Sequence, residues 1–178
     1  MTRHVFAAVL VCVLSASCKG GGSNASPTAP SGAGGTAPTE GAWTGTITRP
    51  GGLAPITVRW EATRDPAVDY RITGPMTLTN GGTSVTIRAS GNTSGNDSNG
   101  YKISMSLTAN TGEIAGFPTC NINGSHVGSQ EGDPFPQPYT RISVPALDMS
   151  YNNCRGFIEY ASPTNSSLTE RTQLNLSK

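Results

Sequence analysis

Apolar and polar residues alternate along most of the chain after residue 42, and this pattern predicts β-strands. In the first such segment, Trp43, Gly45 and Ile47 alternate with threonines. The same period of two recurs over residues 56–62, 70–72, 76–78, 85–89 and 101–107. Because successive side chains of a strand point to opposite faces, each segment would bury one face and expose the other to water. No window keeps a helical period with capping residues, so we expect an all-β domain.

Turn-forming residues separate these segments and predict consecutive hairpins. Gly, Pro, Asn and Asp gather at residues 49–52, 64–66, 80–82, 90–100 and 110–112. Further strands are expected at 119–126, 140–151, 155–160 and 168–176, with Pro145 bulging or breaking the second. Such a series favours an antiparallel up-and-down β-barrel of about eight to nine strands, because closure removes exposed strand edges. A two-sheet β-sandwich is the alternative that the pattern leaves open.

Residues 1–17 have the organisation of an export signal. Arg3 gives a basic start, residues 5–14 are ten apolar residues, and residues 15–17 are small. Ten apolar residues cannot span a bilayer, which needs about 20. Small residues directly before Cys18 resemble the lipobox of bacterial lipoproteins, and the resemblance implies lipidation of Cys18. An ordinary secretory signal with an incidental cysteine is the alternative.

Residues 18–39 predict a flexible tether ahead of a β domain at residues 40–178. The tether consists mainly of Gly, Ser, Ala, Pro and Thr, and it lacks large apolar side chains that would offset the entropy of ordering. The N-terminal lipid would hold the protein at a membrane of the bacterial cell envelope. Lys19 after the cysteine, by resemblance to enteric lipoproteins, favours the outer membrane. A periplasmic or secreted protein is the alternative.

The four cysteines predict one disulfide. Cys12 would leave with the signal and Cys18 would carry the lipid, so Cys120 and Cys154 remain in β-patterned segments. An oxidising envelope would allow these two to form a bridge. Lys plus Arg number 12 against 11 for Asp plus Glu, so no electrostatic attraction to a nucleic acid is expected.

The start of the first strand suggests a known class of barrel. Gly41, Ala42 and Trp43 are similar to the Gly-x-Trp signature of lipocalins and related barrels that bind small ligands. The resemblance implies that Trp43 plugs one end of the barrel beneath an arginine of the last strand, which would be Arg171. A plain core position for Trp43 is the alternative, because tryptophan is usually deeply buried.

Candidate catalytic and metal-binding residues are few. His126 is the one histidine after the signal segment, and with Glu131 and Asp133 it matches no known set of metal ligands, so we expect it to be solvated at a strand end. Residues 96–100 are rich in Asn, Asp and Ser but lack the acidic residue that ends a calcium loop, and they predict a hairpin tip. We therefore expect no metal, no cofactor and no enzymatic activity.

One candidate function is the binding of a small apolar or amphipathic ligand. Trp43, Trp60, Tyr101 and Met105 alternate onto inward faces. These side chains would be either core residues or the walls of a ligand cavity, and only a cavity would support this function.

The other candidate is a structural or protein-interaction module of the cell envelope. Its contacts with an envelope protein would come from exposed loops at residues 90–100 and 128–139, with Phe135 and Tyr139 presented among prolines. A flap that covers one mouth of the barrel is the alternative for the second loop.

Overall fold

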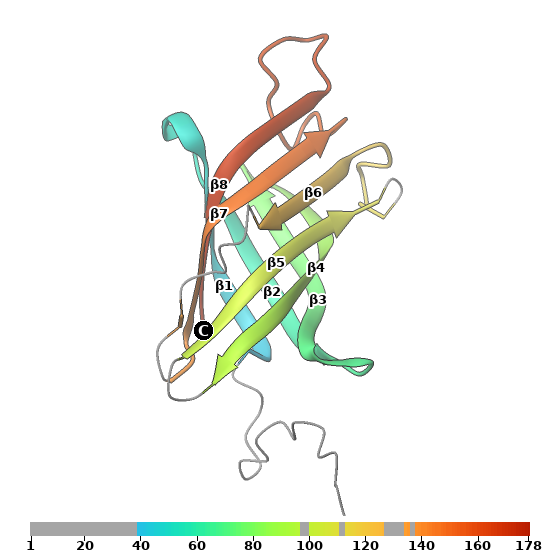
Figure 1. Cartoon of the computed structure of the whole chain (residues 1–178). Helices are drawn as coiled ribbons and strands as arrows, with labels where there is room; N and C mark the ends of the chain where they lie inside the picture. Colours follow the sequence, from blue (N-terminus) through green and yellow to red (C-terminus); the bar gives the residue numbers. More distant parts are fainter. Residues whose placement is uncertain (1–38, 97–99, 111–112, 127–133, 136–137) are drawn as a thin grey trace, which may run out of the picture. The chain divides into compact units, whose positions relative to one another are not determined.

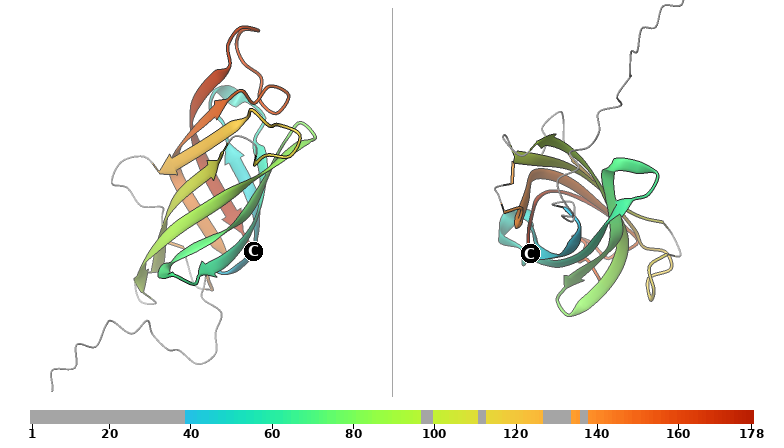
Figure 2. Two further views of the ribbon diagram at one scale, coloured as in Figure 1. Left: turned by 90° about the vertical axis from the view of Figure 1, so that its right-hand side faces the viewer. Right: turned by 90° about the horizontal axis from the view of Figure 1, so that it is seen from below.

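A closed antiparallel β-barrel is the fold of this chain (Figure 1). The computed structural model describes residues 39–96, 100–110, 113–126, 134–135 and 138–178. The strands are β1 (Gly41–Thr48), β2 (Ile56–Asp65), β3 (Val68–Asn80), β4 (Thr83–Asn96), β5 (Gly100–Ala109), β6 (Asn121–His126), β7 (Arg141–Asn152) and β8 (Ser167–Ser177). Each pairs with the next in sequence order, and β8 pairs with β1 to close the ring seen end-on in Figure 2. The predicted up-and-down barrel is confirmed, and the sandwich alternative is excluded.

Helical structure is limited, within the described residues, to the short 3-10 turn η1 (Pro50–Gly52) after β1. Across the same residues, the structure has no helix with the length and apolar character needed to cross a bilayer.

Two predicted segments differ in the structure. Residues 155–160, expected as a ninth strand, form a loop, because the backbone N–H groups of Phe157 and Ile158 both donate to the Cys154 carbonyl and turn the chain. Residues 90–100, expected as a turn region, belong mostly to β4 and β5. β4 and β5 stay paired through this region although most of its side chains are polar. Gly95 and Gly100, near the tip of this hairpin, take positive φ angles. The barrel therefore has eight strands rather than nine.

The predicted interruption at Pro145 is confirmed as a bulge. The register of β7 against β8 shifts between Val144 and Leu147. Proline has no N–H to donate to the ladder, so the pairing slips at this point. The hydroxyl of Thr172 in β8 donates to the Leu147 carbonyl at 2.8 Å, which supports the ladder just beyond the bulge.

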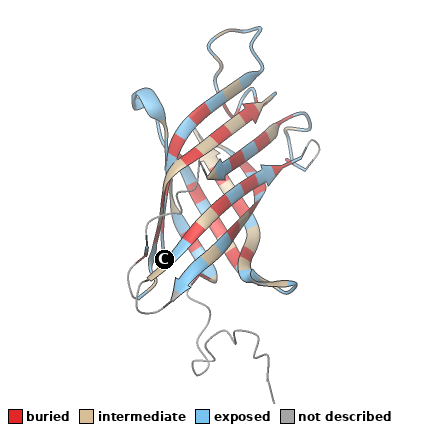
Figure 3. Cartoon of the chain, in the orientation of Figure 1, coloured by how far each residue is buried: buried red, intermediate tan, exposed pale blue. Residues whose placement is uncertain are grey.

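Apolar side chains fill the interior of the barrel, and polar side chains cover its outer wall. Buried and exposed positions alternate along most of the strands in Figure 3. Trp43 and Trp60 are fully buried and Met105 is 2% exposed, so these three are core residues. Tyr101 is only partly buried, at the start of β5. The interior is thus occupied by the protein's own side chains.

Trp43 lies near the end of the barrel where the chain enters β1, but Arg171 is not its partner. The Trp43 Nε1 donates to the Thr39 carbonyl at 2.8 Å, and the Lys178 ammonium lies 4.7 Å from its ring centroid. Arg171 instead points outward and pairs with Asp148 at 3.2 Å. The reason is the alternation of side chains along β8. The even-numbered residues from Glu170 to Leu176 face inward, and residue 178 continues that series.

The seam between β1 and β8 requires a glycine at position 45. A Cβ atom built on Gly45 would lie 1.9 Å from the backbone oxygen of Asn175. We expect Gly45→Val to lower the free energy of unfolding by more than about 3 kcal/mol, because the strands must separate to admit the side chain. Urea denaturation measures this. Thr44→Val, at an exposed neighbouring position, should change stability by less than about 0.5 kcal/mol, and equal stability of the two variants would contradict a tight seam.

Candidate functional site

The two ends of the barrel differ in construction. The end where the chain enters β1 holds Trp43 and Lys178. The opposite end, the upper one in Figure 1, carries η1 with residues 53–55, the β3–β4 turn and residues 153–166, and we call it the loop end. β1 therefore begins at the end of the barrel away from these loops.

A pocket of about 680 Å³ opens at the loop end. Its apolar walls include Leu53 after η1, Phe157 and Ile158 from the loop between β7 and β8, and Leu168 at the start of β8. Arg49 and Glu170 line it as well. Leu53 is 49% exposed, one of two large apolar side chains exposed to this degree among the described residues. The volume lies in the range of sites that hold small organic molecules.

A buried ion pair lies at this pocket. The Arg49 Nε and Nη2 donate to the two carboxylate oxygens of Glu170 at 2.9 and 2.7 Å, and the side chains are only 7% and 5% exposed. Hydrogen bonding to Glu170 raises the pKa of Arg49, so the guanidinium stays charged. These bonds use two of the five N–H donors of a guanidinium. Both ionic groups are therefore held in a fixed, largely water-excluded geometry.

Strand parity explains why these charged residues point inward. Arg49 continues the inward series Trp43, Gly45 and Ile47 past the end of β1, while Glu170 begins the inward series of β8. Neither residue was predicted from the sequence as part of a site. The signal was present, because each is a charged residue at an inward position of an alternating segment.

Tyr151 places a further polar group near the ion pair. Its side chain is fully buried, and among the described residues its hydroxyl has no hydrogen-bond partner. Burial, and secondarily the carboxylate of Glu170, raise the pKa of Tyr151 although Arg49 acts in the opposite direction, so the phenol stays neutral. Native proteins usually pair such a buried hydroxyl with protein, water or a bound group.

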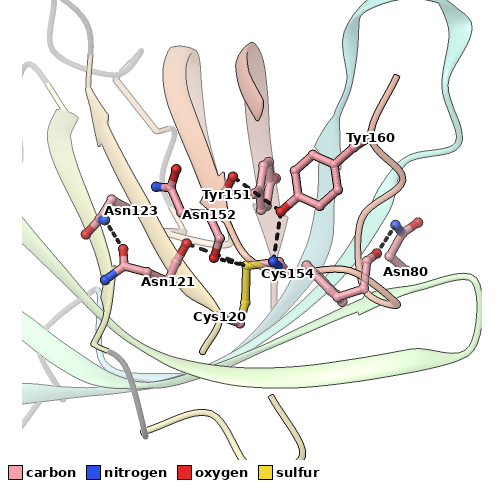
Figure 4. The surroundings of a disulfide bond; sticks show 9 residues. Asn80, Cys120, Asn121, Asn123, Tyr151, Asn152, Cys154 and Tyr160 are labelled. Atoms are coloured by element: carbon pink, nitrogen blue, oxygen red, sulfur yellow. Dashed lines mark hydrogen bonds between the residues drawn. A yellow bond between two sulfur atoms is a disulfide. The ribbon is translucent and has the colours of Figure 1, made fainter. Parts of the chain in front are cut away.

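The predicted disulfide between Cys120 and Cys154 is confirmed, and it anchors one wall of the pocket (Figure 4). It joins the chain just before β6 to the chain just after β7. The Cys154 N–H donates to the Tyr160 hydroxyl at 2.8 Å, and the Asn80 side-chain amide donates to the Phe157 carbonyl at 2.6 Å. The loop is thereby fixed both to the disulfide and to the β3–β4 turn.

No known relative assigns a role to this pocket. The sequence matches no family model, and no curated protein and no solved structure gives a significant match. The geometry of the loop end is therefore the basis from which a function can be inferred.

An aromatic cluster lies at the end of the barrel opposite the pocket. Phe135 donates its backbone N–H to the Tyr101 carbonyl at 3.0 Å, and the Tyr139 ring meets both other rings edge-on, at centroid distances of 5.1 and 5.6 Å. Phe135 is 2% exposed, so it packs inward rather than projecting toward a partner. Part of the predicted interaction loop, residues 128–133 and 136–137, lies outside the described residues, as do residues 97–99 of the other loop.

His126 ends β6, as expected, but it is not fully solvated. The residue is half-buried, and its Nε2 is buried without a hydrogen-bond partner in the described part of the chain. Glu131 and Asp133, which we considered beside it, lie outside the described residues. Within the described ranges, no three His, Cys, Asp or Glu side chains are grouped so that they could hold a metal ion.

Proposed function

We propose that this protein binds a small amphipathic molecule in the pocket at the loop end of its barrel. The observation that carries the proposal is the buried, bidentate Arg49–Glu170 pair at a pocket with apolar walls. The head group of the ligand would contact the ion pair. Its apolar part would lie against Leu53, Phe157 and Leu168.

Energetics supports a recognition role for the ion pair. Burying two charges carries a desolvation penalty that their attraction often only offsets, and apolar residues of similar size can stabilise a fold equally well. A buried pair is therefore weak evidence for stability alone. Fixed polar groups beside apolar walls are what a small-molecule site needs to orient its ligand.

The mouth of the barrel suits this ligand better than the interior does. Trp43, Trp60 and Met105 fill the interior with buried side chains. The pocket opens among the connecting loops, where a ligand can exchange without disturbing the core.

Native mass spectrometry tests the proposed function. The full chain, made in a bacterium with its own N-terminal segment, is incubated with an extract of envelope lipids and weighed under native and denaturing conditions. We expect a discrete extra mass that denaturation removes. The double variant Arg49→Met/Glu170→Leu serves as the control and should carry none. Identical native and denatured masses for the unmodified chain would contradict the proposal.

We also propose that the protein is exported and anchored to the cell envelope by a lipid on Cys18, at the outer membrane. The disulfide supports this location, because such bonds persist mainly in oxidising compartments. The signal-like residues 1–17 and the tether at 18–39 support it from the sequence, although residues 1–38 lie outside the described residues. A periplasmic or secreted protein would share the disulfide but not the lipid.

Labelling of Cys18 distinguishes these locations. In cells fed a clickable palmitate analogue, the unmodified chain should be labelled and should sediment with the membranes. Cys18→Ala should carry no label and should appear in the soluble fraction, because one apolar segment of ten residues cannot anchor it. Equal labelling of Cys18→Ala would contradict the assignment.

A further inference from the structure

The charges that line the pocket restrict the head group that it can hold, and this step rests on the proposed function. Among the described residues, the ionisable groups on the pocket wall that carry charge at neutral pH are one arginine and two glutamates: Arg49, Glu159 and Glu170. Their sum, one positive against two negative, is −1. The pocket is therefore weakly acidic.

The guanidinium of Arg49, the cation that the described part of the chain places at the pocket, is already engaged. Both carboxylate oxygens of Glu170 accept from Arg49, at 2.7 and 2.9 Å. Three N–H donors of the guanidinium remain, but Glu170 neutralises its charge, and an anion bound to those donors would also face the negative charges of Glu170 and Glu159. Displacing Glu170 would leave its side chain, 5% exposed, buried without a counter-ion. An anionic head group thus loses more than it gains.

The other polar groups on the pocket wall favour a ligand head group that donates hydrogen bonds. Glu159 lines the pocket and is exposed, so its carboxylate is accessible to a ligand. Asn80 uses its amide N–H on the Phe157 carbonyl, which leaves its side-chain oxygen as an acceptor. A hydroxyl or ammonium group would meet these acceptors without competing for Arg49.

From this arrangement we infer that the pocket selects amphiphiles whose head group is an amine or a hydroxyl, and discriminates against carboxylate and phosphate head groups. Glu159 sets the preference for the amine, and the Arg49–Glu170 pair sets the discrimination against the anion.

The test uses dodecylamine, dodecanol and dodecanoate, which share one alkyl chain. Their affinities for the full chain are measured by calorimetry at neutral pH, below the concentrations at which they form micelles. We expect the amine and the alcohol to bind, with dodecanoate at least about tenfold weaker, which corresponds to about 1.4 kcal/mol. Glu159→Gln should weaken the binding of the amine about threefold and leave that of the alcohol unchanged, because the charge of an exposed carboxylate is partly screened by solvent.

Glu61→Gln is the matched control, because it removes the same charge from the outer wall of β2 and should alter none of the three affinities. Binding of dodecanoate as tight as that of the amine would overturn this inference and leave the proposed ligand site standing. An unchanged amine affinity in Glu159→Gln would overturn the role of Glu159. Failure of all three probes to bind would overturn the proposed function itself, and this inference with it.

Discussion

Glu170→Leu alone is expected to destabilise the barrel by about 3–5 kcal/mol, because it leaves the Arg49 guanidinium buried without its carboxylate. Arg49→Met should cost a similar amount, since Glu170 is then the uncompensated charge. The double variant should recover most of the loss and lie within about 1 kcal/mol of the unmodified protein, because no isolated charge remains. Urea denaturation of the four proteins measures the coupling between the two side chains.

The exposed pair on the same sheet provides the comparison. Arg171 of β8 pairs with Asp148 of β7 at 3.2 Å, but the arginine side chain is 67% exposed. Arg171→Met should therefore change the free energy of unfolding by less than about 1 kcal/mol. If the losses in Glu170→Leu and Arg49→Met simply added in the double variant, the two side chains would not form a coupled pair.

The second large effect concerns the disulfide. Cys120→Ala/Cys154→Ala should lower the free energy of unfolding by about 3–4 kcal/mol, since the bridge closes a loop of 34 residues in the unfolded chain. Thermal or urea unfolding measures the difference. Unchanged stability would mean that other contacts hold the ends of β6 and β7 equally well.

The same variant should also bind ligand more weakly. Phe157 and Glu159 lie on the loop that begins at the disulfide, so its loss frees one wall of the pocket. We expect the affinity for dodecylamine to fall about tenfold when measured where both proteins remain folded, because ordering the loop would then oppose binding. An affinity equal to that of the unmodified protein would show that the hydrogen bond from Asn80 suffices to hold this wall.

Much of the fold could be predicted from alternation, because one face of each strand must be buried. Trp43, Trp60 and Met105 are core residues at the inward positions that the pattern assigns them. Pro145 marks the bulge because a proline cannot donate to the ladder. The disulfide could be predicted from the count of cysteines together with the predicted export.

The candidate site was harder to predict from the sequence than the fold. Arg49 and Glu170 are 121 positions apart, and only closure of β8 onto β1 brings them together. Parity also explains the wrong assignment of Arg171, which sits at an outward position of β8 while Lys178 reaches Trp43. The apolar residues Phe157 and Ile158 led to the prediction of a strand. In the structure a turn after Cys154 buries both of these consecutive side chains, whereas a strand would point them to opposite faces.

The most direct test of the central claim is to map where an amphiphile binds. Two-dimensional amide spectra of the isotope-labelled chain, titrated with dodecylamine, report each backbone position separately. We expect shifts confined to the loop end, at residues 49–55, 80–83 and 153–161, with the amides around Trp43 and Tyr101 unchanged. Shifts centred on the Trp43 end or spread over the outer wall would contradict the proposed site.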